Sequence, residues 1–235
     1  VLFFFVIFGA YGISGSLPAE QVAAVCSISN LIGCSDNCSL GCDVCGTTCV
    51  GGTLTNLDIA YRNLSAFPVA VCDLVDLVTL QIQKNNFKTG LDPCIGRLTK
   101  LQELFVHSCQ LTSLPDSFGN LTSLSQLYMS TNLLSTLPDS FSSLKSLSVL
   151  TLSINRFTEV PPSVRNLPLT TLGMYDNLLK ELPYWVANMP NVSTIYMSLH
   201  GNYLDCVAIN STMPDSIKTN CYGQLCEWHH LILFE

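Results

Sequence analysis

The sequence predicts an α/β solenoid with a parallel β-sheet on its concave face, short 3₁₀ or irregular segments on its convex face, and cysteine-rich caps. The first observation is the phrase L-x-x-L-x-[LVM]-x-x-[NC]-x-L-x-x-L-P, which begins at Leu101 and again at Leu124, 23 residues later. A fixed period of about 20–29 residues is typical of stacked coils. The second is composition: 48% of the chain is hydrophobic and 11% is charged, which suits a continuous buried core.

Charge and cysteine content limit the class of function. The net charge is −7 and the lysines and arginines form no cluster, so we expect no nucleic-acid partner. Twelve cysteines are too many for a reducing compartment. We therefore expect an extracellular or cell-surface location, reached through the secretory pathway.

Residues 1–16 begin with the apolar run VLFFFVIFGAYGI and end in small residues. This pattern predicts a signal peptide or the end of a transmembrane helix, since a full membrane-spanning helix needs about 20 apolar residues. Membrane association is therefore expected through this segment or through a part of the protein outside the given sequence. Because the first residue is Val1, we expect the chain to be part of a longer one.

Residues 17–53 and residues 205–235 lack the leucine phrase and carry cysteines instead. Terminal coils of a solenoid need a cover, so we predict an N-terminal and a C-terminal cap, the latter truncated. The expected disulfide cysteines are Cys26, Cys34, Cys38, Cys42, Cys45, Cys49, Cys206, Cys221 and Cys226. Zinc is the alternative for Cys42 and Cys45, but that pair has no second C-x-x-C and no nearby histidine. Cys72 and Cys94 lie on neighbouring convex arcs and could also pair.

About seven repeats fill residues 54–204. Their first positions are Leu54, Leu77, Leu101, Leu124, Leu147, Leu169 and Val192. The alternation within each phrase predicts a short strand that buries its leucines and turns the intervening residues outward. The seventh repeat is expected to lose register, because Asn202 and Leu204 come two residues late after Val192.

The ninth position of the phrase predicts a buried ladder of asparagines that satisfies turn backbone inside the core. Its members are Asn85, Asn132, Asn155 and Asn177, and Asn202 is a further candidate. Cys109 occupies this position in the third repeat and Arg62 in the first. Proline follows the next leucine in several repeats, as at Pro115, and favours a short 3₁₀ turn over a long helix.

Residues 54–204 resemble the leucine-rich repeat family, in its short 23-residue L-x-x-L-x-L-x-x-N-x-L-x-x-L-P variety. The longer plant-receptor phrase with its I-P and G motifs is not present, so the resemblance does not extend to plant steroid or peptide receptors. Cysteine-capped arrays of this kind resemble ectodomains of receptor-like proteins. The resemblance implies recognition of a protein, peptide or glycan on the concave face.

The sequence contains no recognisable catalytic or cofactor-binding motif. G-x-S-x-G, H-E-x-x-H, the P-loop and the kinase phrases are all missing, and the four histidines are scattered. We therefore expect no enzyme activity, no catalytic residues, no cofactor and no metal site.

Outward-facing positions of the strands supply the candidate binding residues. These are Tyr61, Gln83, Phe105, His107, Tyr128, Tyr175, Asp176 and Tyr196. Phe105 with Tyr128, and Tyr175 with Tyr196, are expected to be neighbouring pairs. Exposed aromatic residues on a rigid surface suit contact hot spots, but cross-strand packing without any ligand explains them equally well.

Five N-x-S/T sequons make up the glycosylation candidates: Asn37, Asn63, Asn120, Asn191 and Asn210. The function expected from these patterns is a non-catalytic recognition module, the extracellular part of a receptor-like protein. The alternatives are a structural or adhesive protein of a cell wall or matrix, and a secreted enzyme inhibitor.

Overall fold

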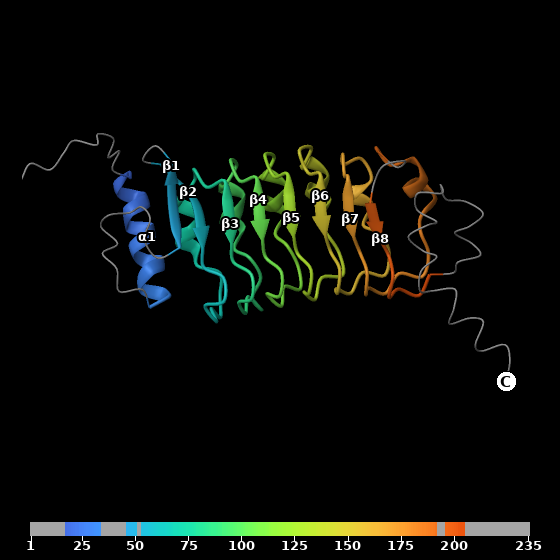
Figure 1. Cartoon of the computed structure of the whole chain (residues 1–235), viewed down its shortest axis with the longest axis horizontal. Helices are drawn as coiled ribbons and strands as arrows, with labels where there is room; N and C mark the ends of the chain where they lie inside the picture. The colour runs from blue at the N-terminus through green and yellow to red at the C-terminus, as the bar shows by residue number, and fades with distance from the viewer. Residues whose placement is uncertain (1–16, 34–45, 51–52, 192–195, 205–235) are drawn as a thin grey trace, which may run out of the picture.

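A computed structural model describes residues 17–33, 46–50, 53–191 and 196–204 of the chain. Within them, one sheet contains eight strands in sequence order. The strands are β1 (Thr47–Val50), β2 (Thr53–Asp58), β3 (Thr79–Gln81), β4 (Glu103–Phe105), β5 (Gln126–Tyr128), β6 (Val149–Thr151), β7 (Thr171–Gly173) and β8 (Tyr196–Ser198). β1 runs antiparallel to β2, and every later pair is parallel (Figure 1). The predicted solenoid with its parallel sheet is confirmed.

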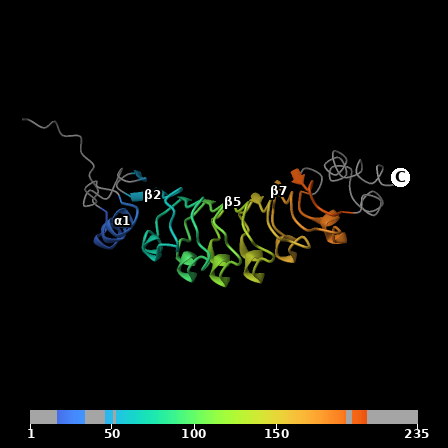
Figure 2. The same cartoon turned by 90° about the horizontal axis from the view of Figure 1, so that it is seen from below.

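Short 3₁₀ helices line the opposite side of the coils and follow the outer edge of the curved array (Figure 2). They are η2 (Val69–Asp73), η3 (Pro93–Arg97), η4 (Asp116–Asn120), η5 (Asp139–Ser143), η6 (Pro162–Val164) and η7 (Tyr184–Asn188). Proline stands directly before five of them, for example Pro115 before η4, because its fixed φ suits the entry to a tight turn. η3 is instead capped by Asp92, whose carboxylate accepts the N–H of Cys94 at 2.8 Å.

The core is a set of stacked columns, one residue from each coil. Leu104, Leu127 and Leu150 are successive members of one column, and all three are fully buried. Each buried leucine contributes about 1.5–3 kcal/mol relative to exposure, so every coil depends on its neighbours for stability. Nearer the convex side, Phe118 and Phe141 continue the stacking, with ring centroids 6.0 Å apart.

The predicted alignment of the seventh repeat is wrong. Leu172 pairs with Met197, so the strand position of Gly173 continues at Ser198 and that of Thr171 continues at Tyr196. From Met197 onward the seventh coil keeps the spacing of the phrase, with Leu199, Asn202 and Leu204 in the usual places, and the two additional residues come before Met197. Leu199, which an alignment counted from Val192 places beside the outward-facing Asp176, is fully buried.

The N-terminal cap contains an α-helix and a β-hairpin that the leucine pattern did not predict. Helix α1 (Ala19–Leu31) is rich in alanine, has Glu20 in its first turn, and ends before Gly33, whose φ of +69° suits a helix C-terminus. It buries Val25 and Ile28 against the first coil, beside η2. β1 covers the free edge of β2, so the parallel sheet does not begin with an open strand.

Polar contacts also attach α1 to the first two coils. Gln21 donates to the carboxylate of Asp76 at 2.9 Å, and Lys100 of the next coil contacts the same carboxylate at 2.6 Å. These hydrogen bonds, that from Lys100 first, hold the pKa of Asp76 below its ordinary value. In the described part of the chain, no helix is long and apolar enough to cross a membrane.

One disulfide is placed in full: Cys72 of η2 joins Cys94 of η3, with 5.7 Å between the Cα atoms. Cys26 and Cys49 of the N-terminal cap are also disulfide-bonded. The other predicted cap cysteines lie outside the described residues: Cys34, Cys38, Cys42, Cys45, Cys206, Cys221 and Cys226. The predictions for residues 1–16 and 205–235 also lie outside them.

Candidate functional site

The asparagine ladder holds the strand ends in register. Asn132 accepts the N–H groups of Cys109 and Leu111, both at 3.0 Å, and donates to the carbonyls of Val106 at 3.0 Å and Met129 at 2.9 Å. Its amide thus joins its own coil to the preceding one. The same bridging role belongs to Asn85, Asn155, Asn177 and Asn202. Because each amide is buried and satisfied, the sheet above the ladder is a rigid platform.

Cys109 takes the ladder position in the third coil as a buried free thiol. Its Sγ donates to the carbonyl of Ile82 at 3.3 Å, which replaces the donor function of an asparagine amide. Burial raises the thiol pKa to about 11. A protonated, buried thiol is a poor nucleophile, which fits a structural role for Cys109 in the ladder.

A left-handed residue precedes the ladder position in every coil. These residues are Tyr61, Lys84, Ser108, Thr131, Ile154 and Asp176, with φ between 51° and 59°, followed by Gly201 at 71°. The kink ends each strand and turns the chain out of the sheet. Thr131 and Ile154 are the strained members, because β-branched residues rarely adopt this conformation.

The concave face is built from the outward-facing side chains of β2 to β8. Phe105 and Tyr128 occupy equivalent positions on β4 and β5 and stack nearly parallel, with centroids 4.7 Å apart and planes 8° apart. Both rings are half-buried. The structure thus brings these two candidates together at the middle of the sheet.

The second expected aromatic pair is wrong in its partner. Tyr175 stacks on His200, at 4.6 Å between centroids and 5° between planes, and Ser198 contacts His200 Nδ1 at 3.2 Å. In the corrected register, Tyr196 aligns with Thr171, four positions before Tyr175. His200 therefore takes the place beside Tyr175 that was expected for Tyr196.

Tyr61 and Lys84 form a separate contact at the N-terminal end of the face. The Lys84 Nζ lies 4.7 Å from the centroid of the exposed Tyr61 ring. Asp176, near the other end, is exposed in its left-handed position. Tyr61, Lys84 and Asp176 thus lie apart from the stacked pair of Phe105 and Tyr128.

Glu103 and Gln126 are outward-facing residues that the sequence interpretation missed. They sit two positions before Phe105 and Tyr128 on the same two strands, so the strand alternation that identified the rings also identifies them. The Tyr128 hydroxyl donates to the Gln126 carbonyl at 2.7 Å, and the Gln126 amide contacts Glu103 at 3.5 Å. We call Glu103, Phe105, Gln126 and Tyr128 the central patch.

His107 and Gln83 border the central patch. Burial, helped by the nearby charge of Lys84, lowers the pKa of His107 below its ordinary value of 6.5, which favours the neutral ring. Gln83 is 9% exposed, and its Oε1 has no hydrogen-bond partner within the described structure. The surroundings of the patch are therefore polar, with the charge of Lys84 nearby.

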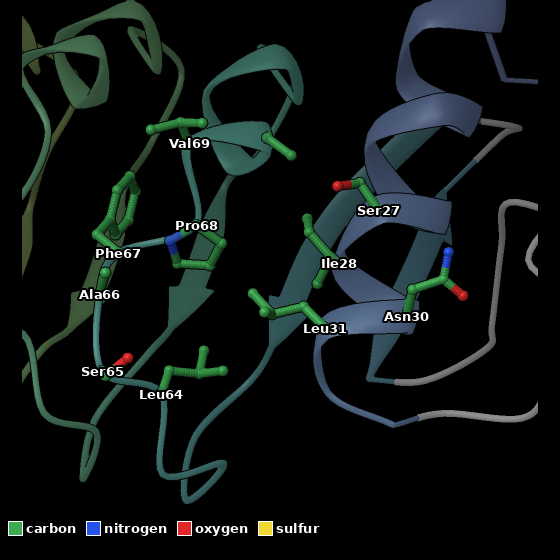
Figure 3. Close-up of a pocket in the computed structure, with 11 residues that line it drawn as sticks. Ser27, Ile28, Asn30, Leu31, Leu64, Ser65, Ala66, Phe67, Pro68 and Val69 are labelled. Carbon is green, nitrogen blue, oxygen red and sulfur yellow. The ribbon is translucent and has the colours of Figure 1, made fainter.

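A groove of about 580 Å³ separates α1 from the first coil, away from the concave face (Figure 3). Ile28 and Leu31 of the helix face Phe67, Pro68 and Val69 across it. Its lining is predominantly apolar and belongs to the packing of the cap.

Three of the five sequons lie among the described residues, and all three asparagines are exposed: Asn63, Asn120 and Asn191. Asn120 ends η4 on the convex side, and Asn63 lies in the turn after β2, where its φ is 53°. Neither belongs to the concave face. Asn37 and Asn210 lie outside the described residues.

Comparisons with known proteins place the fold. Residues 99–157 match the family model described as leucine rich repeat. The structure of the Leptospira interrogans LRR protein LIC12759 is 31% identical, with a TM-score of 0.61, and the match covers 64% of this chain and 38% of that one. The sequence matches none of the curated proteins with which it was compared.

Two plant receptor structures share the fold at lower identity. The Arabidopsis thaliana receptor kinase GASSHO1/SCHENGEN3 has an LRR ectodomain solved in complex with Casparian strip integrity factor 2. It is 23% identical, with a TM-score of 0.53, over 70% of this chain and 26% of that one. Pollen receptor kinase 3 is 24% identical, with a TM-score of 0.57, over 69% of this chain and 81% of that one.

Proposed function

We propose that this chain, which folds as a leucine-rich repeat solenoid and matches the leucine rich repeat model over residues 99–157, is a non-catalytic recognition module that binds a protein or peptide partner on its concave face. The carrying observation is the stacked pair of Phe105 and Tyr128, half-buried at the middle of a rigid sheet. Aromatic side chains in such positions dominate binding energy in many interfaces. They lose little conformational entropy on binding, since their neighbours already hold them.

The location that fits this role is the cell surface or extracellular space. The disulfide between Cys72 and Cys94 supports it, since disulfides persist in oxidising compartments. The exposed sequons at Asn63 and Asn120 support it as well, since a glycan at either site would leave the concave face open. The receptor-ectodomain neighbours agree with a receptor-like role.

A selection from a random peptide display library tests the binding role without a known ligand. Peptides that bind the wild-type chain are assayed again on the double variant Phe105→Ala/Tyr128→Ala. The control is Tyr184→Ala/Tyr203→Ala, which removes two exposed rings outside the patch. We expect the first variant to lose at least about tenfold in affinity, the effect of removing one hot spot, while the control binds as wild type.

Circular dichroism and thermal unfolding show whether both variants remain folded. Equal binding by the two folded variants would contradict the proposal. Expression in a eukaryotic secretory host tests the location. An endoglycosidase mass shift that becomes smaller in Asn63→Gln/Asn120→Gln agrees with it, because the other three sequons remain in that variant. Secreted protein without any shift argues against glycosylation at these sites.

A further inference from the structure

We infer that the central patch of Glu103, Phe105, Gln126 and Tyr128 binds a cationic side chain of the partner, arginine in preference to lysine. This inference rests on the proposed function and names the chemistry of the group recognised. It starts from Glu103, a half-buried carboxylate at the middle of the concave face.

Glu103 has unused hydrogen-bonding capacity. Its Oε1 contacts the Gln126 amide at 3.5 Å and its Oε2 contacts the Thr79 hydroxyl at 3.4 Å. Both contacts are long compared with a charge-assisted bond of about 2.7–2.9 Å. Each oxygen can therefore accept a shorter bond from an incoming N–H group, so the carboxylate is oriented but not saturated.

No basic side chain of the described residues forms an ion pair with Glu103. The two salt bridges found there are Arg97 with Asp73 and Lys100 with Asp76. Lys84, the lysine of the concave columns, lies over the Tyr61 ring instead. A half-buried carboxylate without a counter-charge favours a cation supplied from outside.

The aromatic stack lies beside this carboxylate. Phe105 and Tyr128 follow Glu103 and Gln126 by two positions on the same strand faces, a distance of about 6.6 Å along the strand. A guanidinium group can pair with a carboxylate and at the same time lie against an aromatic ring, which an ammonium does less well. Carboxylate and rings together therefore select arginine.

No side chain of the patch itself carries a positive charge, and Gln126 and Tyr128 offer oxygens that can accept hydrogen bonds. The Tyr128 hydroxyl gives its proton to Gln126 at 2.7 Å, so its oxygen faces the ligand as an acceptor. His107, the next outward residue after Phe105, lies just beyond β4, and burial lowers its pKa, which disfavours the charged ring. The net charge of −7 for the whole chain adds a long-range attraction for a basic partner.

The test uses a fluorescent, capped peptide that alternates glycine and arginine, and the same peptide with citrulline in place of arginine. Citrulline keeps the shape of the side chain and removes the charge. Fluorescence anisotropy at low ionic strength should show the arginine peptide binding about five- to tenfold more tightly to the wild-type chain. Glu103→Gln should abolish this difference.

Glu159→Gln is the matched control, since Glu159 is exposed and has the same side chain outside the patch. It changes net charge equally and should leave the five- to tenfold preference intact. An equal loss in the two variants would overturn the inference, because it would trace the preference to net charge. Absence of any arginine preference in the wild-type chain would overturn it as well, and would leave a neutral peptide or a glycan as the ligand.

The two proposals fail in different ways. If library-selected peptides depend on Phe105 and Tyr128 but show no dependence on Glu103, the concave face binds a partner and the cationic specificity is wrong. If the selected peptides ignore Phe105 and Tyr128, the proposed function itself is wrong.

Discussion

Gly119 of η4 lies directly against the main chain of Ser140 in η5. A Cβ added at Gly119 would collide with the Ser140 carbonyl oxygen and lie 2.7 Å from its Cβ. The convex side of the solenoid is therefore closed by backbone contact between neighbouring 3₁₀ helices. The same relation holds between Gly96 and Ser117, one coil earlier.

Gly119→Ala is expected to destabilise the fold by about 1–3 kcal/mol, because the coils must separate locally to admit the methyl group. Ser142→Ala is the control. Ser142 occupies in η5 the position that Gly119 occupies in η4, but it is exposed, and the next 3₁₀ helix, η6, is shorter. Urea unfolding followed by circular dichroism measures both. Equal midpoints for wild type and Gly119→Ala would mean that the convex side yields without cost.

Asn132→Ala is expected to cost roughly 3 kcal/mol or more in unfolding free energy. The change leaves the N–H groups of Cys109 and Leu111 without their acceptor. It also removes one hydrogen bond each from the carbonyls of Val106 and Met129. Asn120→Ala, at an exposed position, should change stability by less than about 0.5 kcal/mol. Equal losses of unfolding free energy at Asn132 and Asn120 would show that the buried ladder adds no stability beyond that of an exposed asparagine.

Ile154→Asn is expected to stabilise the chain by about 1 kcal/mol. Ile154 has a φ of 55° and is 42% exposed, so the substitution relieves backbone strain and sacrifices little burial. Ile154→Val keeps the β-branch and should bring no gain. The thermal midpoints of the two variants decide the matter, and a lower midpoint for Asn than for Val would contradict the strain argument.

His107 should make stability depend on pH below about 6.5. Its pKa is lowered in the folded state, mainly by burial, so the unfolded chain binds the proton more readily once the pH falls below the ordinary value of 6.5. Stability from this residue is thus complete above that pH and declines as the pH falls toward the folded pKa. His107→Gln should show a smaller drop in urea midpoint between about pH 7.5 and pH 5.5 than wild type. An unchanged drop would place the effect elsewhere.

The repeating part of the fold could be predicted because its pattern is local. The spacing of Leu101, Leu104 and Val106 reports the strand directly, since alternate residues must share a face. Helix α1 carries no such phrase, so the leucine pattern does not predict it. The hairpin with β1 depends on pairing between Thr47 and Leu57, a non-local contact that a repeat alignment does not encode.

The candidate site was predictable in its columns and not in its details. In the seventh coil, the register of the strand is fixed by the ladder residue Asn202. An alignment that starts at Val192 gives the wrong register, because it begins in the segment of variable length before the strand. Additional residues are tolerated between coils because connecting segments at the surface accept insertions more readily than strands do. The stacking of Tyr175 on His200 depends on side-chain positions that spacing alone does not determine. The same holds for Glu103, which forms no ion pair with another described residue.

The bond between Cys72 and Cys94 also has a mechanical consequence. Coils of a solenoid contact only their neighbours, so a pulling force applied to the two ends detaches them one after another. The covalent link joins the first two coils and shields the chain between them from extension. A single-molecule extension trace should therefore lengthen by about 75 Å after reduction, since the sequence separation of 22 residues is released at about 3.4 Å per residue. The first two coils of the array thus resist extension under force, whereas the coils after Cys94 can unfold and extend.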